Sequence, residues 1–489
     1  MPGLPGRRNA PMTMLQARRR AGRLRRPMKA TPEQFKLLSR WHARLEPQRA
    51  LDLTGETQDE DHRWYVALDA WEHEGETHEL RGPPAVPRIV GNIRLAADRF
   101  GAASTHLFSG FRGTGKTTEL SRLADELTRL GDFAILRVSA RDYHPLTRSL
   151  SIDELALLLA AGIGEAAQAL LGDKQLDEAT KEGVWTRIRA SLERAFKQTN
   201  LVLKFGPFEL RSALWQGESA SANLRKLLGG RADLIKEFLH EFVREITLAV
   251  HPRQVVVIVD DLEKYDAPTD RVGTIYREMA DLFFNSPDLL KLPHCHVIYT
   301  VPPYLSFIHT GIGEKYDQRM HVLPSIKLRA PRPEHTAFAP GIAALNALLA
   351  ERVDLVALFG GERDACTHRL IATSGGNLRD LFSLMRLTIE SALAVGMPVG
   401  LKEVERSIQQ IAAFRPLLKE PFLLLRDIER QGDLTDVGTD RQAGLALAMD
   451  QHLLLCYWNG VFWYDTHPLI EPQLERHHDK PPPGSNSNE

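Results

Sequence analysis

The sequence predicts an α/β fold in which a parallel β-sheet carries a helical insertion and is followed by a helical domain and a small C-terminal module. Three observations lead to this prediction. Short apolar segments alternate with amphipathic helical segments between residues 96 and 330, a long helical stretch interrupts that alternation, and an Asn-Gly pair joins two apolar segments near the C-terminus. The chain has 489 residues, 43% of them hydrophobic, which is enough for two to four folded units.

Composition excludes several classes of protein. Lys and Arg total 62 and Asp and Glu total 63, so no overall positive charge indicates a nucleic-acid or membrane surface. The three cysteines are far apart and form no C-x-x-C pair, which argues against a disulfide scaffold or a cysteine zinc site. No apolar run is expected to span a bilayer, because the most apolar predicted helix, residues 155–171, contains Glu165. We therefore expect a cytoplasmic protein that does not enter membranes.

The two ends differ from the rest of the chain. Residues 1–30 contain eight Arg, one Lys and no acid, so they carry +9 and the remainder carries −10. We interpret them as a disordered basic arm, with a transit peptide or a nucleic-acid-binding tail as alternatives, and translation starts at Met12, Met14 or Met28 are also compatible with the sequence. Residues 31–95 form a lead-in region without an assigned role, and residues 471–489 are expected to be a disordered tail.

Five strands are predicted in the central region, at residues 104–109, 133–138, 255–259, 296–301 and 322–328. The third is uniformly β-branched, which is typical of a parallel strand covered on both faces. A helix is expected from Lys116 to about Leu130, because its leucines recur at helical spacing and Gly131 is suited to end it. The α/β core over residues 96–330 would thus contain a helical insertion at about 150–250.

The strongest motif is a complete G-x-x-x-x-G-K-[ST], which directly follows the first strand and opens a helix. In that position the backbone N–H groups of the loop point at phosphate oxygens, and the lysine reaches the β and γ phosphates. The threonine after it is placed to ligate Mg²⁺. The predicted nucleotide-binding residues are Gly110, Phe111, Arg112, Gly113, Thr114, Gly115, Lys116, Thr117 and Thr118.

Two acidic residues end the β-branched strand. We expect Asp260 to hold Mg²⁺ together with Thr117, and Asp261 to act as the catalytic base that orients or deprotonates the attacking water. Glu263 is the weaker candidate for that base. Without the phosphate loop, an acidic turn after an ordinary strand would be the better interpretation.

Two further residues are candidate nucleotide contacts. Thr300 ends the next strand, where its hydroxyl could contact the γ-phosphate, although threonine is also common in strands for its β propensity. Arg379 lies in the first turn of a helix that follows Gly375-Gly376-Asn377, where a cation opposes the helix dipole and favours an anionic partner. That partner is either a nucleotide phosphate or a surface carboxylate.

These motifs resemble those of the AAA+ ATPases, especially the branch that joins initiator-like ATPases to the signalling STAND ATPases. The resemblance spans about residues 96–470 and implies a P-loop NTPase fold with a helical lid at 331–412 and a winged-helix domain at 413–470. It implies that the phosphate loop is Walker A, Asp260 and Asp261 Walker B, Thr300 sensor 1 and Arg379 sensor 2. By the same resemblance Arg319, shortly before the fifth strand, would be an arginine finger, which is a catalytic role.

The charge of the winged-helix region bears on its partner. Residues 417–470 contain four basic and eight acidic residues, a balance of −4, whereas DNA phosphates require Lys and Arg. We therefore favour an ATP-binding and ATP-hydrolysing switch, with ATP and Mg²⁺ as cofactors, that acts on a protein partner and that could be a homo-oligomer. The alternative is an initiator-like or transposition-helper ATPase that binds DNA through the winged helix and the basic arm.

Overall fold

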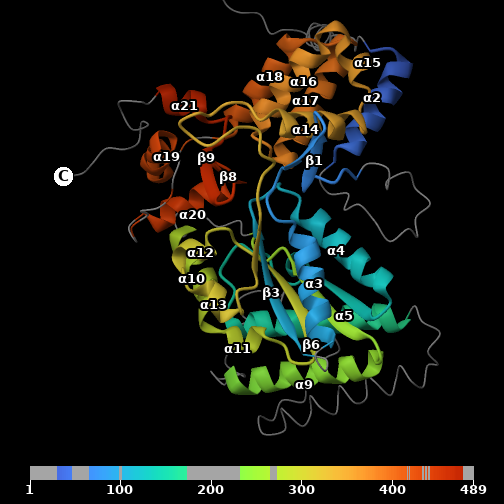
Figure 1. Cartoon of the computed structure of the whole chain (residues 1–489), viewed down its shortest axis with the longest axis vertical. Coiled ribbons are helices and arrows are strands. Elements are labelled where there is room, and N and C mark those ends of the chain that lie inside the picture. Colours follow the sequence, from blue (N-terminus) through green and yellow to red (C-terminus); the bar gives the residue numbers. More distant parts are fainter. Residues whose placement is uncertain are drawn as a thin grey trace, which may run out of the picture.

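A computed structural model of the chain describes residues 30–46, 65–98, 102–172, 232–264, 272–415, 417, 419–431, 434, 438 and 441–476. The basic arm, residues 173–231 of the helical insertion and residues 477–489 lie outside this described part. In Figure 1 a sheet-based core lies at the bottom, the helices of the predicted lid at the top, and the C-terminal module at one side.

The core is a five-stranded parallel sheet with the strand order β4-β5-β6-β3-β7. The strand that leads into the phosphate loop therefore lies between β6 and β7, beside the strand that carries Thr300. The five strands are β3 (Ser104–Gly110), β4 (Phe133–Ser139), β5 (Gln254–Asp260), β6 (Cys295–Val301) and β7 (Met320–Leu323). Four of the predicted strands are confirmed to within one residue at each end.

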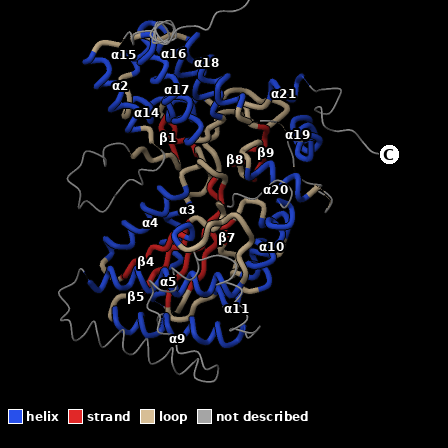
Figure 2. Tube along the Cα trace, turned by 180° about the vertical axis from the view of Figure 1, so that it is seen from behind, coloured by secondary structure: helices blue, strands red, loops and turns tan. Residues whose placement is uncertain are grey.

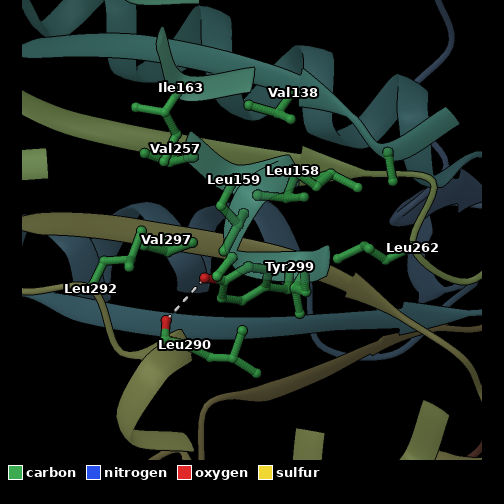
Figure 3. Close-up of a cluster of buried hydrophobic side chains, with 14 of the residues drawn as sticks. Val138, Leu158, Leu159, Ile163, Val257, Leu262, Leu290, Leu292, Val297 and Tyr299 are labelled. Atoms are coloured by element: carbon green, nitrogen blue, oxygen red, sulfur yellow. Dashed lines mark hydrogen bonds between the residues drawn. The ribbon is translucent and has the colours of Figure 1, made fainter. Parts of the chain in front are cut away.

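Alternate residues of the strands cover two separate cores, as the pleat requires. On one face the sheet packs against α3 (Ala85–Asp98) and α4 (Lys116–Leu130), and Gly131 ends α4 with a left-handed φ of 81° as predicted. On the other face it packs against α5 (Ile152–Gly172), α9 (Ala232–Val250) and α10 (Val272–Asn285). Figure 3 shows this second core, where Leu158, Leu159 and Ile163 of α5 meet Val257 and Tyr299 of the sheet.

One described helix, α5, is long and apolar enough to cross a membrane by length and composition, so the expectation that no apolar run reaches this length is wrong. Its apolar window is 72% buried inside the protein, between the sheet and α9. Asp153 and Glu154 lie in its first turn, and Glu165, further along, accepts a hydrogen bond from the Tyr143 hydroxyl at 2.8 Å. The helix is apolar on nearly every side because protein surrounds it on nearly every side.

The fifth strand is shorter and earlier than predicted, since β7 ends at Leu323 and Pro324 follows. Proline has no N–H for a sheet ladder, so the pairing stops there. The chain stays extended, but its N–H groups bond elsewhere: that of Ser325 to Cys456 O, that of Ile326 to Gly376 O and that of Lys327 to Leu80 O. This linker segment, residues 324–328, thus joins the core to the lid, the C-terminal module and the lead-in region.

The lead-in region, residues 31–95, is largely structured where it is described. Helix α2 (Pro32–Arg44) begins with a capping box formed by Thr31 and Gln34 and packs on the lid helix α17. A hairpin of β1 (Ala70–His73) and β2 (Glu76–Glu79) precedes α3. The chain then passes Arg81 and Gly82 at the edge of the phosphate loop.

The lid is a bundle of helices above the core (Figures 1 and 2). Its members are α14 (Ala339–Ala350), α15 (Leu355–Phe359), α16 (Arg363–Ser374), α17 (Leu378–Val395) and α18 (Leu401–Ala413). Three short helices, α11 (Pro287–Leu290), α12 (Leu305–Ile308) and α13 (Ile312–Lys315), belong to the core instead.

The C-terminal module contains α19 (Lys419–Gln431), α20 (Gln442–Asp450), the hairpin β8 (Leu454–Trp458) and β9 (Phe462–Thr466), and α21 (Glu471–Arg476). The Asn459-Gly460 pair lies in the connection of this hairpin, but the connection is not the two-residue turn that an Asn-Gly pair favours. Strand pairing ends at Trp458 and Phe462, so three residues form the connection, and of these Gly460 alone has positive φ. Residues 471–476 form a helix that buries Leu474, so the expected disordered tail does not begin at 471.

Candidate nucleotide-binding site

The phosphate loop has the geometry that its sequence predicts. β3 ends at Gly110 and α4 begins at Lys116, so the loop leads from the middle of the sheet into a helix N-terminus. Gly113 and Gly115 have φ of 87° and 97°, which is left-handed backbone that glycine adopts without strain. The free N–H groups of the first turn of α4, which includes Thr117 and Thr118, can hold phosphate oxygens.

The lid lies directly on this loop. The Asn377 amide donates to Arg112 O at 2.8 Å, and the N–H of Arg379 donates to Gly113 O at 3.2 Å. A Cβ added to Gly113 would lie 2.3 Å from Asn377 Oδ1 and 2.7 Å from Arg379 Cβ, which leaves no room for a side chain. The predicted sensor 2 helix therefore begins at the phosphate loop, and Arg379 lies beside it.

Lys116 is buried and is held by three acceptors of the chain. Its ammonium donates to Gly110 O at 2.7 Å and to Phe111 O at 3.2 Å, and it lies 3.1 Å from Glu263 Oε1. Burial lowers the pKa of Lys116, while Glu263 and Asp260 oppose that change. Burial also raises the pKa of Glu263, but Lys116, Lys264 and Thr300 lower it more, so that the carboxyl stays ionised beside the lysine.

The predicted magnesium ligands lie together. The Thr117 hydroxyl donates to Asp260 Oδ2 at 2.9 Å, which brings a hydroxyl and a carboxylate to the carboxyl end of β5. Burial and the neighbouring charges of Glu263 and Asp261 raise the pKa of Asp260. A cation at this point would relieve that excess of negative charge, and Mg²⁺ prefers oxygen ligands, so these residues fit Mg²⁺.

Asp261 lies differently from the expected base. Its backbone is left-handed, with φ of 72°, and its side chain turns toward the end of β4. There Asp261 Oδ2 accepts a hydrogen bond from the Ser139 hydroxyl at 2.9 Å, and Oδ1 pairs with Lys264. Both carboxylate oxygens are therefore engaged by residues other than those of the phosphate loop.

Thr300 belongs to β6 of the sheet, and Arg379 to α17 of the lid. The Thr300 side chain is fully buried, and its hydroxyl oxygen accepts the N–H of Leu262 at 3.2 Å. The Arg379 guanidinium is only half-buried and, within the described part of the chain, makes no ion pair. Burial, followed by the cations of Arg112 and Arg141, lowers the pKa of Arg379, so an anionic ligand would be stabilising here.

Arg319 is not part of this site. It lies just before β7 and pairs weakly with Asp317 at 3.4 Å. Gly110 pairs with Leu323, four residues further along, so Arg319 lies about 13 Å below the loop of its own chain at 3.3 Å per residue. It would have to act on a neighbouring subunit if it acts on phosphate.

Two residues of the loop contact the C-terminal module. The Phe111 side chain is 2% exposed and belongs to a hydrophobic cluster with Leu445 and Met449 of α20, so only its backbone can face a nucleotide. The Arg112 guanidinium pairs with Asp450 at 2.9 Å, and the Tyr276 hydroxyl of α10 donates to the other oxygen of Asp450 at 2.8 Å. The motif gives no signal for either contact.

Arg81, which is 4% exposed, is a residue at the site that the sequence motifs did not indicate. Its guanidinium donates to Thr114 O at 2.7 Å and lies 3.6 Å from Glu119 of α4. The next residue, Gly82, lies against the indole of Trp458, because an added Cβ would be 2.4 Å from two ring atoms. The wing hairpin β8–β9 thus lies over the edge of the site that Arg81 forms.

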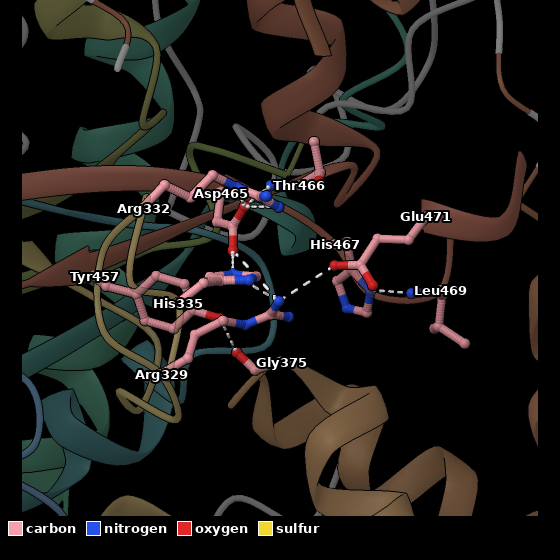
Figure 4. Close-up of polar contacts among 10 residues, drawn as sticks. All are labelled: Arg329, Arg332, His335, Gly375, Tyr457, Asp465, Thr466, His467, Leu469 and Glu471. Carbon is pink, nitrogen blue, oxygen red and sulfur yellow. Dashed lines mark hydrogen bonds and ion pairs between the residues drawn. The ribbon is translucent and has the colours of Figure 1, made fainter. Parts of the chain in front are cut away.

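Polar contacts fix the C-terminal module to the segment between the linker and α14, and to the lid helices (Figure 4). The fully buried Asp465 accepts hydrogen bonds from Arg332 at 3.2 Å and His335 at 2.7 Å. The Tyr457 hydroxyl donates to Gly375 O at 2.6 Å, immediately before the Asn377 and Arg379 that contact the loop. Asp380, next to Arg379, pairs with Arg415 and accepts a hydrogen bond from His467 at 2.9 Å.

No known sequence family and no curated protein matches the chain. Among solved structures, the chain is similar to ORC of Drosophila bound to DNA, with a TM-score of 0.36, 11% identity and coverage of 97% of this chain and 95% of the other. It is similar to the ORC2 protein of Aeropyrum pernix in ADPNP and ADP complexes, with a TM-score of 0.36, 11% identity and coverage of 81% and 97%.

A third similar structure is a Walker-type ATPase of Pyrococcus abyssi, with a TM-score of 0.36, 12% identity and coverage of 79% and 95%. The fold itself is established by the strand order and by the position of the phosphate loop between β3 and α4. This chain has the fold of a Walker-type ATPase with a helical lid and a C-terminal winged-helix-like module.

Proposed function

We propose that the chain binds and hydrolyses Mg-ATP and that the bound nucleotide controls how the C-terminal module docks on the core. The observation that carries this proposal is the double contact at the phosphate loop. Phe111 and Arg112, two of the variable positions of the motif, are held by the C-terminal module through a hydrophobic cluster and an ion pair. A nucleotide that binds the loop must therefore affect these contacts.

The chemistry follows from residues already placed. Loop N–H groups and the N-terminus of α4 bind the phosphates, and Lys116 neutralises the β and γ oxygens. Thr117 and Asp260 would hold Mg²⁺, which supplies positive charge to the β and γ phosphates when bound. Arg379 adds a cation from the lid, so the lid closes on the side of the site opposite the sheet.

The switch arises from competition. Phosphates attract Arg112 and repel Asp450, so ATP binding weakens the ion pair that fastens α20 to the loop. Release of α20 would expose the apolar faces that now pack on α10, and such faces bind protein partners. We propose a protein partner in the cytoplasm, and a homo-oligomer if Arg319 reaches a neighbour's site.

Calorimetric titration with ATP, and a phosphate-release assay, test this function in the full chain. The protein should bind ATP at full affinity only when Mg²⁺ is present, and it should release phosphate. If the folded wild-type protein binds no adenine nucleotide, the proposal fails.

A second candidate function is DNA binding through the winged helix and the basic arm. The +9 charge of residues 1–30 favours it. Against it, α20, the helix in the recognition position, is buried on α10: a Cβ added to Gly273 would lie 3.0 Å from Ala443, and Arg277 bonds Gln442 at 3.2 Å. Duplex binding that falls steeply with salt and disappears without residues 1–30 would favour this second function.

A further inference from the structure

We propose, resting on the ATPase function above, that Glu263 and not Asp261 is the carboxylate that takes the proton of the attacking water. In the same site Glu263 also serves as the counter-ion of Lys116 until phosphate replaces it. This assignment differs from the motif, which places the base directly after Asp260.

The position of Glu263 is the first argument. Its side chain is 1% exposed and lies 3.1 Å from the Lys116 ammonium, the group that binds the β and γ phosphates. Lys116, Lys264 and Thr300 lower the pKa of its carboxyl, and the charge of Glu263 also acts on Arg379. Glu263 therefore contacts Lys116 and interacts electrostatically with Thr300 and Arg379, the other two side chains expected to face the γ-phosphate.

The position of Asp261 is the second argument. The left-handed backbone at Asp261 turns its side chain to Ser139 and Lys264, which occupy both carboxylate oxygens. The same turn brings Glu263, two residues later, back under the phosphate loop. A straight strand would point both acids, two residues apart, to the same face, and the left-handed residue sends them to different partners instead.

Burial supports the role of Glu263. A carboxylate in a site closed to solvent has no competing hydration, so it can hold a single water in a fixed orientation. When the phosphates attract Lys116, Glu263 loses part of its counter-charge and its affinity for a proton rises. The arrangement therefore makes the carboxylate more basic only after ATP has bound.

The step balances as follows. The water oxygen forms a bond to the γ-phosphorus, and the bond from the γ-phosphorus to the bridging oxygen breaks, its electron pair leaving with ADP. One proton of the water passes to the Glu263 carboxylate and later to solvent. Lys116 and Arg379 stabilise the negative charge on the phosphoryl oxygens during transfer.

The test compares Glu263→Gln with Asp261→Asn, two variants that each exchange one carboxylate for an amide of the same size. Glu263→Gln should bind ATP at least as tightly as wild type, because Lys116 loses a competing anion, and should lose turnover by about 100-fold or more. After incubation with Mg-ATP it should retain ATP, whereas wild type retains ADP. Asp261→Asn should keep turnover within a fewfold of wild type.

Three results would overturn the assignment: Glu263→Gln hydrolyses ATP normally, it loses ATP binding together with turnover, or Asp261→Asn alone stops hydrolysis. If Glu263→Gln does not fold, Glu263→Asp decides, because it keeps the charge and moves it by one methylene. Retained ATP binding with slowed turnover in Glu263→Asp supports a base, and unchanged turnover refutes it. Wild-type protein that binds no ATP would refute the proposed function instead, so the two failures are distinguishable.

Discussion

Replacing Asp450 with Asn should release the C-terminal module from the phosphate loop and raise the affinity for ATP. Asp450 and Arg112 are 2.9 Å apart, and their side chains are 14% and 16% exposed, so solvent screens the pair only in part. A hydrogen bond to a charged group contributes about 1.5–3 kcal/mol, and a neutral amide keeps about 1 kcal/mol of it. The variant should thus lose about 0.5–2 kcal/mol of docking free energy, or roughly two- to thirtyfold in the docking equilibrium.

Because ATP and Asp450 compete for Arg112, the same factor is the upper limit for the gain in ATP affinity. Titration calorimetry measures that gain. Docking itself can be followed by the fluorescence of Trp458, which packs on Gly82 and becomes exposed on release. Subtracting the emission of the matching Trp458→Phe protein isolates the signal of this tryptophan. The matched control is Asp427→Asn, which removes an ion pair with Arg441 inside the C-terminal module. Unchanged ATP affinity and Trp458 emission in Asp450→Asn would falsify the competition.

Three other changes have defined outcomes. Lys116→Ala removes a charge-assisted contact to phosphate and should weaken ATP binding by roughly tenfold to a hundredfold in calorimetry, and equal affinity would contradict the role of the loop. Mixing inactive Arg319→Ala and Lys116→Ala proteins should restore some phosphate release if Arg319 acts on a neighbour, whereas Arg379→Ala mixed with Lys116→Ala should not. Full activity of Arg319→Ala alone would make Arg319 structural. Burial lowers the pKa of His296 and His321 to about 4, so their contribution to stability should be lost as pH drops from about 6.5 to 4. A urea unfolding free energy that is constant over this range would contradict it.

The sequence predicts the sheet and the phosphate loop well because their signals are local. A β-branched run such as residues 255–259 is stable when other elements pack on both of its faces. A glycine-rich loop between a strand and a helix is suited to bind phosphate. The pairing of Thr117 with Asp260 follows from the same logic, since the carboxyl ends of parallel strands share one edge. These features depend on residues that are neighbours in sequence or in the sheet.

The rest depends on contacts between distant segments or on a single backbone angle. Asp450 lies far along the chain from Arg112, and nothing in either motif pairs them. Arg81 precedes the loop in a region with no motif at all. The separation of Asp261 from Glu263 depends on φ at Asp261, which is left-handed although the residue is not glycine, and residue spacing alone does not report that angle.

The phosphate loop is neutralised by two carboxylates that differ in how they are attached. Lys116 is paired with Glu263, which is fixed to the sheet by β5, and Arg112 is paired with Asp450, which ends a helix of a separate module. The phosphates of ATP would repel both. Glu263 cannot leave because the core holds it, so it stays beside the γ-phosphate, where a carboxylate can bind the attacking water. Asp450 can leave because the C-terminal module carries it, so the same repulsion that positions a base on one side of the loop would drive movement on the other.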